Sequence, residues 1–456
     1  MRVLLVEPPL TKHDVGSGII ALAEPLGLEC AASTLAGHDV RLLDMRLDRR
    51  LDRALESFRP HVVGTGGCTV GVKGIRRLLA EVKRFDPAIR TVVGGHHATV
   101  QPQDFLDPQI DAAVVGEGET TFPELLAAWD AGRGLDDVAG LALRGPDGGL
   151  RRTPERPLAD LDSLPRPARH LVQHYRPHYF RGPWRPIASV YTSRGCPHRC
   201  AFCGMWKVHR GQYRTRSVEK IVAELRELPE TRIDLTDDNT FDNVAWAARL
   251  AQAIRDAGIR KEYKVYARAD TVAANPDLVR SWRQAGLRLA LVGFESFRED
   301  DLQAWNKRNS LETNARAVEV LQANEVEIAS YFVIHPEYLP ADFAALKRHI
   351  DARRLTQPVF TMLTPFPGTD LYEQVRDRIT HRDFELCDFF HVVLPTRMPE
   401  RDFYREFVGL YRHAYAIRRM RRFARKSFFS GLSWAQIRMR QRFFSQLRAL
   451  PRTDFP

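Results

Sequence analysis

The sequence predicts an α/β protein with two parallel sheets: an N-terminal Rossmann-like domain, then a partial (β/α)6 barrel, then a helical C-terminal region. Short runs rich in Val, Ile and Leu alternate with stretches of helical periodicity, which is typical of parallel strands joined by crossover helices. A proline-rich segment interrupts this alternation and divides it into two series. The 456 residues, 44% of them hydrophobic, are enough for large cores.

The first series fills residues 1–145. A helix is expected over Leu26–Leu35, and a second apolar stretch between residues 75 and 82 repeats at helical spacing. Several expected strands end in glycine, and open α/β sheets bind ligands beyond the carboxyl ends of their strands. This edge is therefore the expected binding edge of the domain. The expected strands are Arg2–Val6, Asp39–Leu43, His61–Gly64, Thr91–Gly94 and Ala112–Gly116.

Residues 146–186 are expected to connect the two domains. Seven prolines between residues 151 and 186 favour either a linker or a strapped connection. The alternation resumes over residues 187–380, where six β/α units indicate a partial barrel rather than the full eight. The expected strands are Ile187–Thr192, Arg232–Leu235, Tyr263–Tyr266, Leu289–Gly293, Ile328–Ile334 and Val359–Leu363.

Residues 381–456 are expected to form basic helices. The apolar stripe Phe403, Phe407, Leu410, Ala414 and Ile417 is followed by an Arg-rich stretch and by the aromatic segment Leu432–Leu450. Residues 401–456 hold 14 Lys and Arg against 3 Asp and Glu, so the whole net charge of +11 belongs to this segment. Such a segment favours contact with an anionic membrane surface, although a solvated or structural role and nucleic-acid binding are alternatives. Nucleic acid is the least favoured of the three.

The composition also limits the location of the protein. No apolar run approaches the ~18–20 residues of a spanning helix. The N-terminus lacks the long apolar stretch and small-residue cleavage site of a signal peptide. Six cysteines, of which three are clustered, do not make a disulfide framework. The sequence therefore predicts a cytoplasmic protein, peripheral at a membrane if the basic segment binds lipid.

The sharpest chemical signal is Cys196-Pro-His-Arg-Cys200-Ala-Phe-Cys203, which directly follows an expected strand. Three thiolates within eight residues can bind one soft metal centre. A structural zinc site would need a fourth ligand, and neither His198 nor His209 continues a zinc-finger spacing. Three cysteines instead leave one iron of a four-iron cluster open. A zinc knuckle remains the alternative.

This motif resembles the cysteine loop of the radical S-adenosylmethionine (SAM) enzymes. The resemblance implies that the three cysteines hold a [4Fe-4S] cluster, whose open iron chelates SAM and cleaves it to a 5′-deoxyadenosyl radical. It also implies that Phe202 helps to place the adenine. Further segments at expected strand ends resemble SAM-contacting segments of the same family. They are Asp237, Asp238 and Asn239; Arg268, which would pair with the SAM carboxylate; Gly293 and Glu295; and Thr364 and Pro365.

The N-terminal region resembles the cobalamin-binding domain of one radical SAM subgroup, a generic doubly wound domain being the alternative. The implied cobalamin contacts are Glu24, Leu26, Gly27, Thr65, Gly66, Cys68, Thr69, Gly94, Gly95, His96, Gly116, Glu117, Gly118 and Glu119. Many cobalamin proteins ligate cobalt with the His of a DxHxxG motif. His13 stands in an HxxG sequence here but lacks the Asp that would orient it. A loop histidine is the favoured interpretation, and the lower cobalt ligand stays open.

Three segments, Glu24–Glu29, Arg194–Trp206 and Leu394–Pro399, make the chain similar to the hopanoid C-3 methyltransferase family. The resemblance implies methyl transfer from methylcobalamin to an sp3 carbon of a hopanoid or other isoprenoid lipid, with a one-electron reductant of flavodoxin or ferredoxin type. Non-methylating rearrangement or oxidation, and methylation of a soluble natural product, are the alternatives. No acid or base can be assigned. Expected substrate-wall residues are Trp206, Tyr213, Tyr266, Tyr331, His335 and Phe366.

Overall fold

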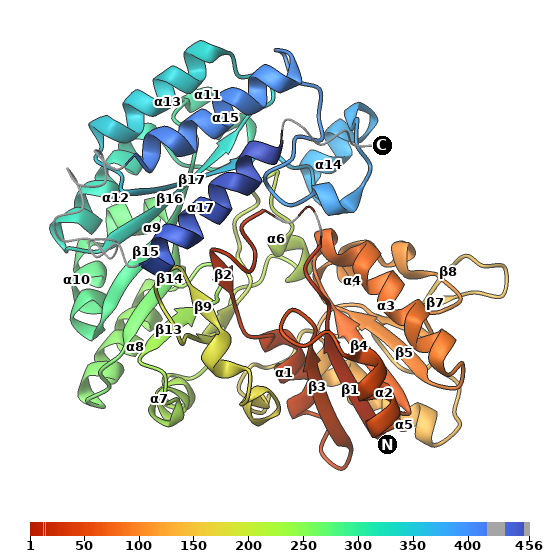
Figure 1. Cartoon of the computed structure of the whole chain (residues 1–456). Helices are drawn as coiled ribbons and strands as arrows, with labels where there is room; N and C mark the ends of the chain where they lie inside the picture. Colours follow the sequence, from red (N-terminus) through yellow and green to blue (C-terminus); the bar gives the residue numbers. More distant parts are fainter. Residues whose placement is uncertain (12, 14, 417–433, 451–456) are drawn as a thin grey trace.

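The protein folds into two α/β halves joined side by side, as the computed structural model shows (Figure 1). The structure describes residues 1–11, 13, 15–416 and 434–450. The N-terminal half holds a seven-stranded sheet, and the second half holds a six-stranded parallel sheet curved into a partial barrel. The predicted fold class is therefore confirmed.

The N-terminal sheet has the order β3-β1-β4-β5-β6-β7-β8. Alternate residues of its central strands enter separate cores on the two faces: Val3 and Leu5 on one, Leu4 and Val6 on the other. The five expected strands form its parallel part, and the sheet then continues past residue 145 through an antiparallel hairpin. The strands are β1 Arg2–Glu7, β3 Asp39–Asp44, β4 Val62–Gly66, β5 Arg90–Gly94, β6 Ala112–Val114, β7 Leu141–Arg144 and β8 Leu150–Arg152; the helices are α1 Leu26–Ser33, α2 Leu51–Phe58, α3 Val72–Phe85, α4 His96–Val100 and α5 Gly118–Asp130.

The proline-rich connection is a packed strap rather than a loose linker. Val172, Tyr175, Tyr179 and Trp184 are buried in the core of the N-terminal half. Its last strand, β9 (Phe180–Arg181), pairs with the short β2 (Ala21–Leu22) of the N-terminal half. The aromatic side chains between the prolines therefore fasten the connection to one half before the chain enters the other.

The barrel sheet has the order β10-β13-β14-β15-β16-β17, with every neighbouring pair parallel. Its strands are β10 Ala188–Val190, β13 Arg232–Leu235, β14 Glu262–Arg268, β15 Leu287–Glu295, β16 Glu327–Ile334 and β17 Gln357–Met362. The surrounding helices are α7 Val218–Glu227, α8 Val244–Asp256, α9 Ala269–Ala274, α10 Pro276–Ala285, α11 Glu299–Ala304, α12 Leu311–Ala323, α13 Pro340–Ala352 and α14 Asp370–Val375. After β10, a small ribbon of β11 (Ser193–Arg194) and β12 (Arg214–Thr215) brackets α6 (Met205–Val208).

The C-terminal helices pack on the barrel beside its edge strand β17. The Tyr411 hydroxyl, on α15 (Glu400–Ala414), donates to the Phe360 carbonyl of β17 at 2.7 Å. Phe443, on α17 (Trp434–Ala449), meets Tyr411 with ring centroids 5.4 Å apart. The Gln446 side chain of α17 accepts from the Gly16 backbone amide at 3.0 Å. Figure 1 shows α17 crossing in front of the barrel strands, near β2.

The predicted apolar stripe and part of the aromatic segment that follows it are buried inside the protein. Phe403, Phe407, Leu410 and Ala414 are buried, and so are Phe443, Leu447 and Leu450 of the second stretch. Arg438, Arg442 and Arg448 are exposed on the outer face of α17. Ile417 and the Arg-rich stretch that follows it lie outside the described residues. No helix within the described ranges has the length and apolarity to span a bilayer.

Candidate cofactor site at the domain junction

The cysteine loop, residues 195–204, begins directly after β11 and is held by hydrogen bonds from both sides. The Ala201 amide donates to the Trp305 carbonyl at 2.9 Å, and the Leu371 amide donates to the Ala201 carbonyl at 2.9 Å. Cys200 is buried, whereas Cys196 and Cys203 are half-buried. Burial raises the pKa of Cys196 to about 11 and that of Cys203 to about 12. The three thiols lie on one fixed loop, and a cluster bound there would hold them as thiolates in spite of their raised pKa values.

The acidic segment after β13 shapes the start of this loop. Both oxygens of Asp237 are engaged by Thr192, and one of them also accepts from the Ser193 amide at 2.8 Å. Asp238 accepts from the Gly195 amide at 2.7 Å, and burial raises its pKa to about 6. These two carboxylates hold the backbone that enters the cysteine loop. Their predicted contact with SAM stays a prediction.

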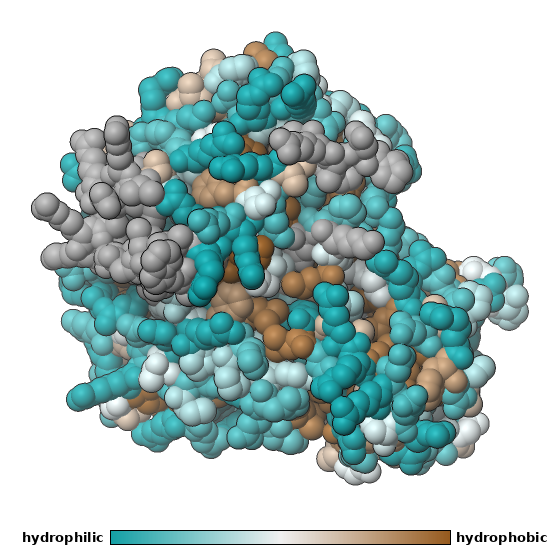
Figure 2. Space-filling model, viewed as in Figure 1, coloured by the Kyte–Doolittle hydropathy of each residue, from teal (hydrophilic) through white to brown (hydrophobic). Residues whose placement is uncertain are grey.

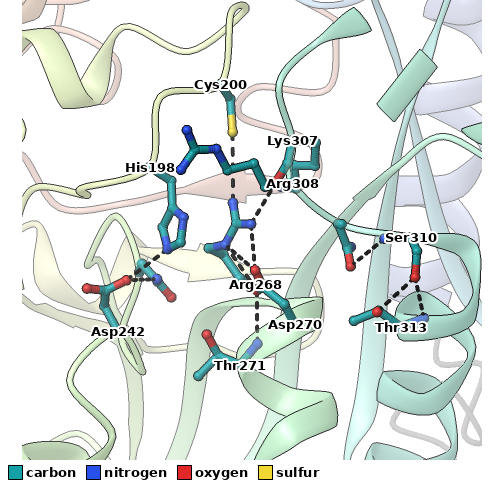
Figure 3. Close-up of polar contacts among 12 residues, drawn as sticks. His198, Cys200, Asp242, Arg268, Asp270, Thr271, Lys307, Arg308, Ser310 and Thr313 are labelled. Atoms are coloured by element: carbon teal, nitrogen blue, oxygen red, sulfur yellow. Dashed lines mark hydrogen bonds and ion pairs between the residues drawn. The ribbon is translucent and has the colours of Figure 1, made fainter. Parts of the chain in front are cut away.

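The third residue of the segment reaches the loop indirectly. The Asn239 side-chain amide donates to Asp242 at 2.9 Å, and the same carboxylate oxygen lies 3.2 Å from His198 Nε2 (Figure 3). His198 stands between the first two cysteines, so this contact orients the middle of the loop. It also accounts for His198 without a zinc ion.

Two buried cations lie beside Cys200. Arg268, at the end of β14, directs Nη1 toward Cys200 Sγ at 3.8 Å and donates through Nη2 to the Lys307 carbonyl at 2.8 Å (Figure 3). The Lys307 ammonium pairs with Glu295 at 2.7 Å. Neither Lys307 nor Asp270, the carboxylate partner of Arg268, lies in a recognisable motif. The sequence alone therefore does not identify them as site residues. Gly293 is tightly enclosed, since a Cβ there would meet the Glu295 carboxylate and lie 3.1 Å from Lys307 Nζ.

An apolar wall covers the far side of the cysteine loop. Phe202 meets Trp305 edge-on with centroids 5.9 Å apart, and both pack with Leu363 and Leu371. Thr364 and Pro365 follow this wall after β17, and the Thr364 hydroxyl donates back to the Met362 carbonyl at 3.1 Å. The predicted contact of Phe202 with an adenine stays a prediction.

In the N-terminal half, the carboxyl edge is built from backbone. Gly66 and Gly67, after β4, lie against Gly94 and Gly95, after β5; we call these four residues the glycine cradle. Gly95 has φ +91°, and a Cβ there would lie 2.8 Å from the Gly67 nitrogen. A Cβ at Gly66 would lie 3.1 Å from the Gly94 carbonyl oxygen. Only glycine permits this approach of the two loops.

The cradle is bordered by buried polar atoms. Within the described residues, Thr65 Oγ1 and His96 Nε2 are buried without a hydrogen-bond partner. Such atoms fit a ligand that supplies the missing partners. A Cβ at Gly204 would lie 3.5 Å from His96 Cε1, so the cradle side of the first half touches the cysteine loop of the second. A bulky ligand with polar side groups, such as cobalamin, would thus lie next to the cysteines.

Cys68 and Thr69, in the loop after β4, differ in exposure. Cys68 is exposed, although desolvation by the surrounding protein raises its pKa. Thr69 is buried and its hydroxyl lies 3.1 Å from His97 Nδ1. His97, unlike His96, is a core residue that also contacts Asp104 at 2.9 Å. His13 lies edge-on to His391 with ring centroids 6.3 Å apart.

The carboxylates expected beside cobalamin tie the two halves together. Glu117 and Glu119 meet Arg194 at 3.0 and 2.5 Å, and Glu117 also meets Arg214 at 2.7 Å. We call these four residues the charge clamp. Burial alone would raise the pKa of Glu117, but the two arginines hold it at about 2. Gly116, with φ +88°, and Gly118 give this loop its turn.

Glu24, in the first segment predicted to contact cobalamin, also joins the two halves. The Glu24 carboxylate accepts from the Ser189 amide of β10 at 2.5 Å and lies 3.2 Å from Arg176 of the strap. Leu26 and Gly27 follow at the start of α1 and are more exposed. Glu24 is thus committed to the barrel, and a contact of this segment with cobalamin stays a prediction.

The six expected substrate-wall residues have different immediate neighbours, and their role in a substrate wall stays a prediction. Tyr266 and Tyr331 lie together against Leu289 and Leu291 inside the barrel. Tyr213 lies near Thr240, His335 stacks on Trp305, Phe366 lies against Phe389, and Trp206 lies between Arg199 and Lys207. Figure 2 shows apolar surface gathered at the centre of the viewed face, along the junction of the two halves.

Comparison with known families matches both halves. Residues 18–126 match the B12 binding domain, and residues 190–350 match the radical SAM superfamily. Among solved structures, the methyltransferase TsrM from Kitasatospora setae, bound to cobalamin and a [4Fe-4S] cluster, aligns with a TM-score of 0.66 and 22% identity over 82% of this chain and 78% of that one. The cobalamin-dependent radical enzyme OxsB aligns with a TM-score of 0.72 and 15% identity over 99% of this chain and 71% of that one. These two likenesses show the fold.

Curated relatives are more similar in sequence. An anaerobic magnesium-protoporphyrin IX monomethyl ester cyclase of Rubrivivax gelatinosus is 30% identical over 88% of this chain and 74% of its own length. Hopanoid C-3 methylase of Methylococcus capsulatus is 32% identical over 90% of this chain and 79% of its own length. With both domains matched and the two cofactor edges adjoining, this chain belongs to the family of cobalamin-dependent radical SAM methyltransferases that contains hopanoid C-3 methylase.

Proposed function

We propose that the protein methylates an sp3 carbon of a hopanoid or related isoprenoid lipid. The observation that carries the proposal is the 32% identity with hopanoid C-3 methylase along 90% of the chain. The apolar surface at the junction of the two halves supports a substrate of low polarity (Figure 2).

When bound, the cluster and SAM supply a radical that removes a hydrogen atom from carbon, and cobalamin supplies the methyl group. The chain's own residues hold and shield these groups. Cys196, Cys200 and Cys203 would bind the cluster, and the glycine cradle would support cobalamin. The wall of Phe202 and Trp305 would keep water from the reacting carbon. A one-electron reductant of flavodoxin or ferredoxin type would supply the electrons.

The alternative is a family member that does not methylate, or that methylates a soluble natural product. The relative named as a cyclase, at 30% identity, favours keeping the non-methylating alternative. The barrel pair Tyr266 and Tyr331 offers hydroxyl groups that a more polar substrate could use. Product analysis separates these possibilities.

The test is anaerobic turnover with methyl-deuterated SAM, a chemical reductant and a hopanoid-containing lipid extract. The expected result is deuterium in a hopanoid, detected by mass spectrometry, and its absence when Cys200 is replaced by alanine. Label confined to water-soluble molecules would overturn the lipid assignment.

We also propose that the outer face of α17 contacts an anionic membrane. Phe443 of this helix is buried in the protein, so the contact would be electrostatic and carried by the exposed Arg438, Arg442 and Arg448. Each basic residue near such a surface contributes about 1 kcal/mol. Changing all three to glutamine should weaken binding to phosphatidylglycerol vesicles roughly a hundredfold. The matched control changes three exposed arginines elsewhere on the barrel half, Arg280, Arg316 and Arg376, to glutamine. Equal vesicle binding by both variants would contradict the membrane role.

A further inference from the structure

We propose that Arg268 is a positioning residue of the iron–sulfur cluster, which donates a hydrogen bond to the Cys200 thiolate and raises the reduction potential of the cluster. Asp270 fixes the orientation of this donor. The inference rests on the cluster proposed at the three cysteines and is independent of the substrate.

The geometry leaves the Arg268 guanidinium little freedom. Its Nε lies 3.0 Å and its Nη2 lies 2.7 Å from the two oxygens of Asp270, which is a fork-to-fork pairing. Nη2 also donates to the Lys307 carbonyl at 2.8 Å. The remaining nitrogen, Nη1, is the one directed at Cys200 Sγ, at 3.8 Å (Figure 3). The side chain is 7% exposed, so water competes little for this donor.

The effect comes from the direction of the donor rather than from net charge. Arg268 is balanced by Asp270, and Lys307 is balanced by Glu295. Glu295 has a left-handed backbone with φ +65°, an uncommon conformation for this residue type. The four charges sum to zero, so a nearby cluster would experience mainly the N–H dipole aimed at Cys200. Hydrogen bonds to cluster sulfurs stabilise the more negative, reduced state and raise the potential.

The rival assignment is contact with the carboxylate of SAM. That role would fall to the second N–H group of Nη1, since Nη2 already donates to two protein oxygens. The two roles predict different measurements. A cluster donor changes the potential when SAM is absent, whereas a SAM ligand changes the affinity for SAM and leaves the SAM-free potential unchanged.

The experiment is an EPR-monitored redox titration of the reconstituted holoenzyme without SAM, followed by titration of SAM binding. Arg268→Gln should move the midpoint to more negative values by at least a tenfold change in the reduction equilibrium, about 59 mV for one electron. The double variant Arg268→Gln/Asp270→Asn removes the donor without changing the net charge, so its midpoint should also move to more negative values. The matched control is Arg280→Gln, an exposed arginine of α10, which should leave the midpoint unchanged.

An unchanged midpoint in Arg268→Gln with weakened SAM binding would overturn the proposal in favour of the carboxylate role. An unchanged midpoint together with lower thermal stability would overturn the proposal and show that Arg268 only stabilises the fold. If Arg268→Gln does not retain iron, Arg268→Lys decides, since lysine keeps the charge but not the fixed fork. An intermediate midpoint supports the proposal, and a wild-type midpoint refutes it. A wild-type protein that assembles no cluster would instead refute the proposed function.

Discussion

The two cofactor edges that meet at the junction are built from different materials. The N-terminal edge consists of backbone, since Gly66, Gly67, Gly94 and Gly95 bring two loops together where a side chain would collide. The barrel edge consists of charged side chains that contact the cysteine loop, such as Asp238, which accepts from the Gly195 amide, and Arg268, which is directed at Cys200. We therefore expect the N-terminal edge to lose its cofactor when a side chain is added to one of its glycines. We expect the barrel edge to lose its cofactor when one of its polar partners is removed.

The largest expected effect is at the barrel edge. Cys200→Ala should abolish cluster assembly and turnover, because Cys200 is the buried member of the cysteine set. Cobalamin should still bind, since the glycine cradle belongs to the other half. Iron and cobalt analysis of the purified protein checks both statements. Loss of both metals would show that the two edges depend on each other.

The corresponding change in the cradle is Gly95→Val. The new side chain would meet the Gly67 backbone. The backbone φ of +91° at position 95 also disfavours any β-branched residue. We expect loss of cobalamin and a cost of roughly 3 kcal/mol in folding stability, with iron retained. Gly74→Ala, inside α3 with nothing within 4 Å of the new Cβ, is the matched control. Cobalamin retention by the valine variant would refute the cradle.

The charge clamp joins the two edges, and its removal should have an intermediate effect. Arg194→Gln would leave Glu119 without its 2.5 Å partner and deprive Glu117 of one of two. Breaking a buried ion pair from one side costs about 3–5 kcal/mol. The thermal unfolding temperature should fall by several degrees, as calorimetry would show. An unchanged unfolding temperature would show that the charge clamp does not help to hold the two halves together.

The smallest predicted effect concerns pH and His209, which lies 3.4 Å from the Arg214 guanidinium of the clamp. Burial, together with the charge of Arg214, lowers the pKa of His209 to about 4. A depressed folded-state pKa contributes stability above the unfolded pKa of about 6.5, and this stability is lost as the pH falls toward 4. Urea unfolding of His209→Gln should show a shallower decline over this window than the wild type. Parallel curves would contradict the assignment.

Most of the fold could be predicted from the sequence, because buried parallel strands are continuous apolar runs between helices. The hairpin β7–β8 was missed, since its second strand, Leu150–Arg152, carries two arginines and buries little. The proline-rich strap was ambiguous, because only the structure shows Tyr179 and Trp184 in a core. Prolines restrict the backbone in a loose linker and in a packed strap alike, so they do not distinguish the two.

The candidate site was predictable only where chemistry requires a motif. The cysteines and the cradle glycines have no substitute, so their spacing is informative. Lys307 and Asp270 were not identifiable, because a buried ion pair can be placed by any neighbouring element. The sequence favours a membrane contact for the aromatic residues of the C-terminal region as a group, yet Phe443 is buried against the barrel. An amphipathic pattern does not distinguish a face that packs on protein from a face that packs on lipid.

The central claim is that two cofactors meet at this junction to transfer a methyl group. The most direct measurement is the pair of SAM-derived products in a single anaerobic reaction with a hopanoid substrate. We predict 5′-deoxyadenosine and S-adenosylhomocysteine in equal amounts, matched by methylated product, because one SAM is cleaved and another donates its methyl group in each cycle. Formation of 5′-deoxyadenosine with an altered but unmethylated product, and without S-adenosylhomocysteine, would contradict it.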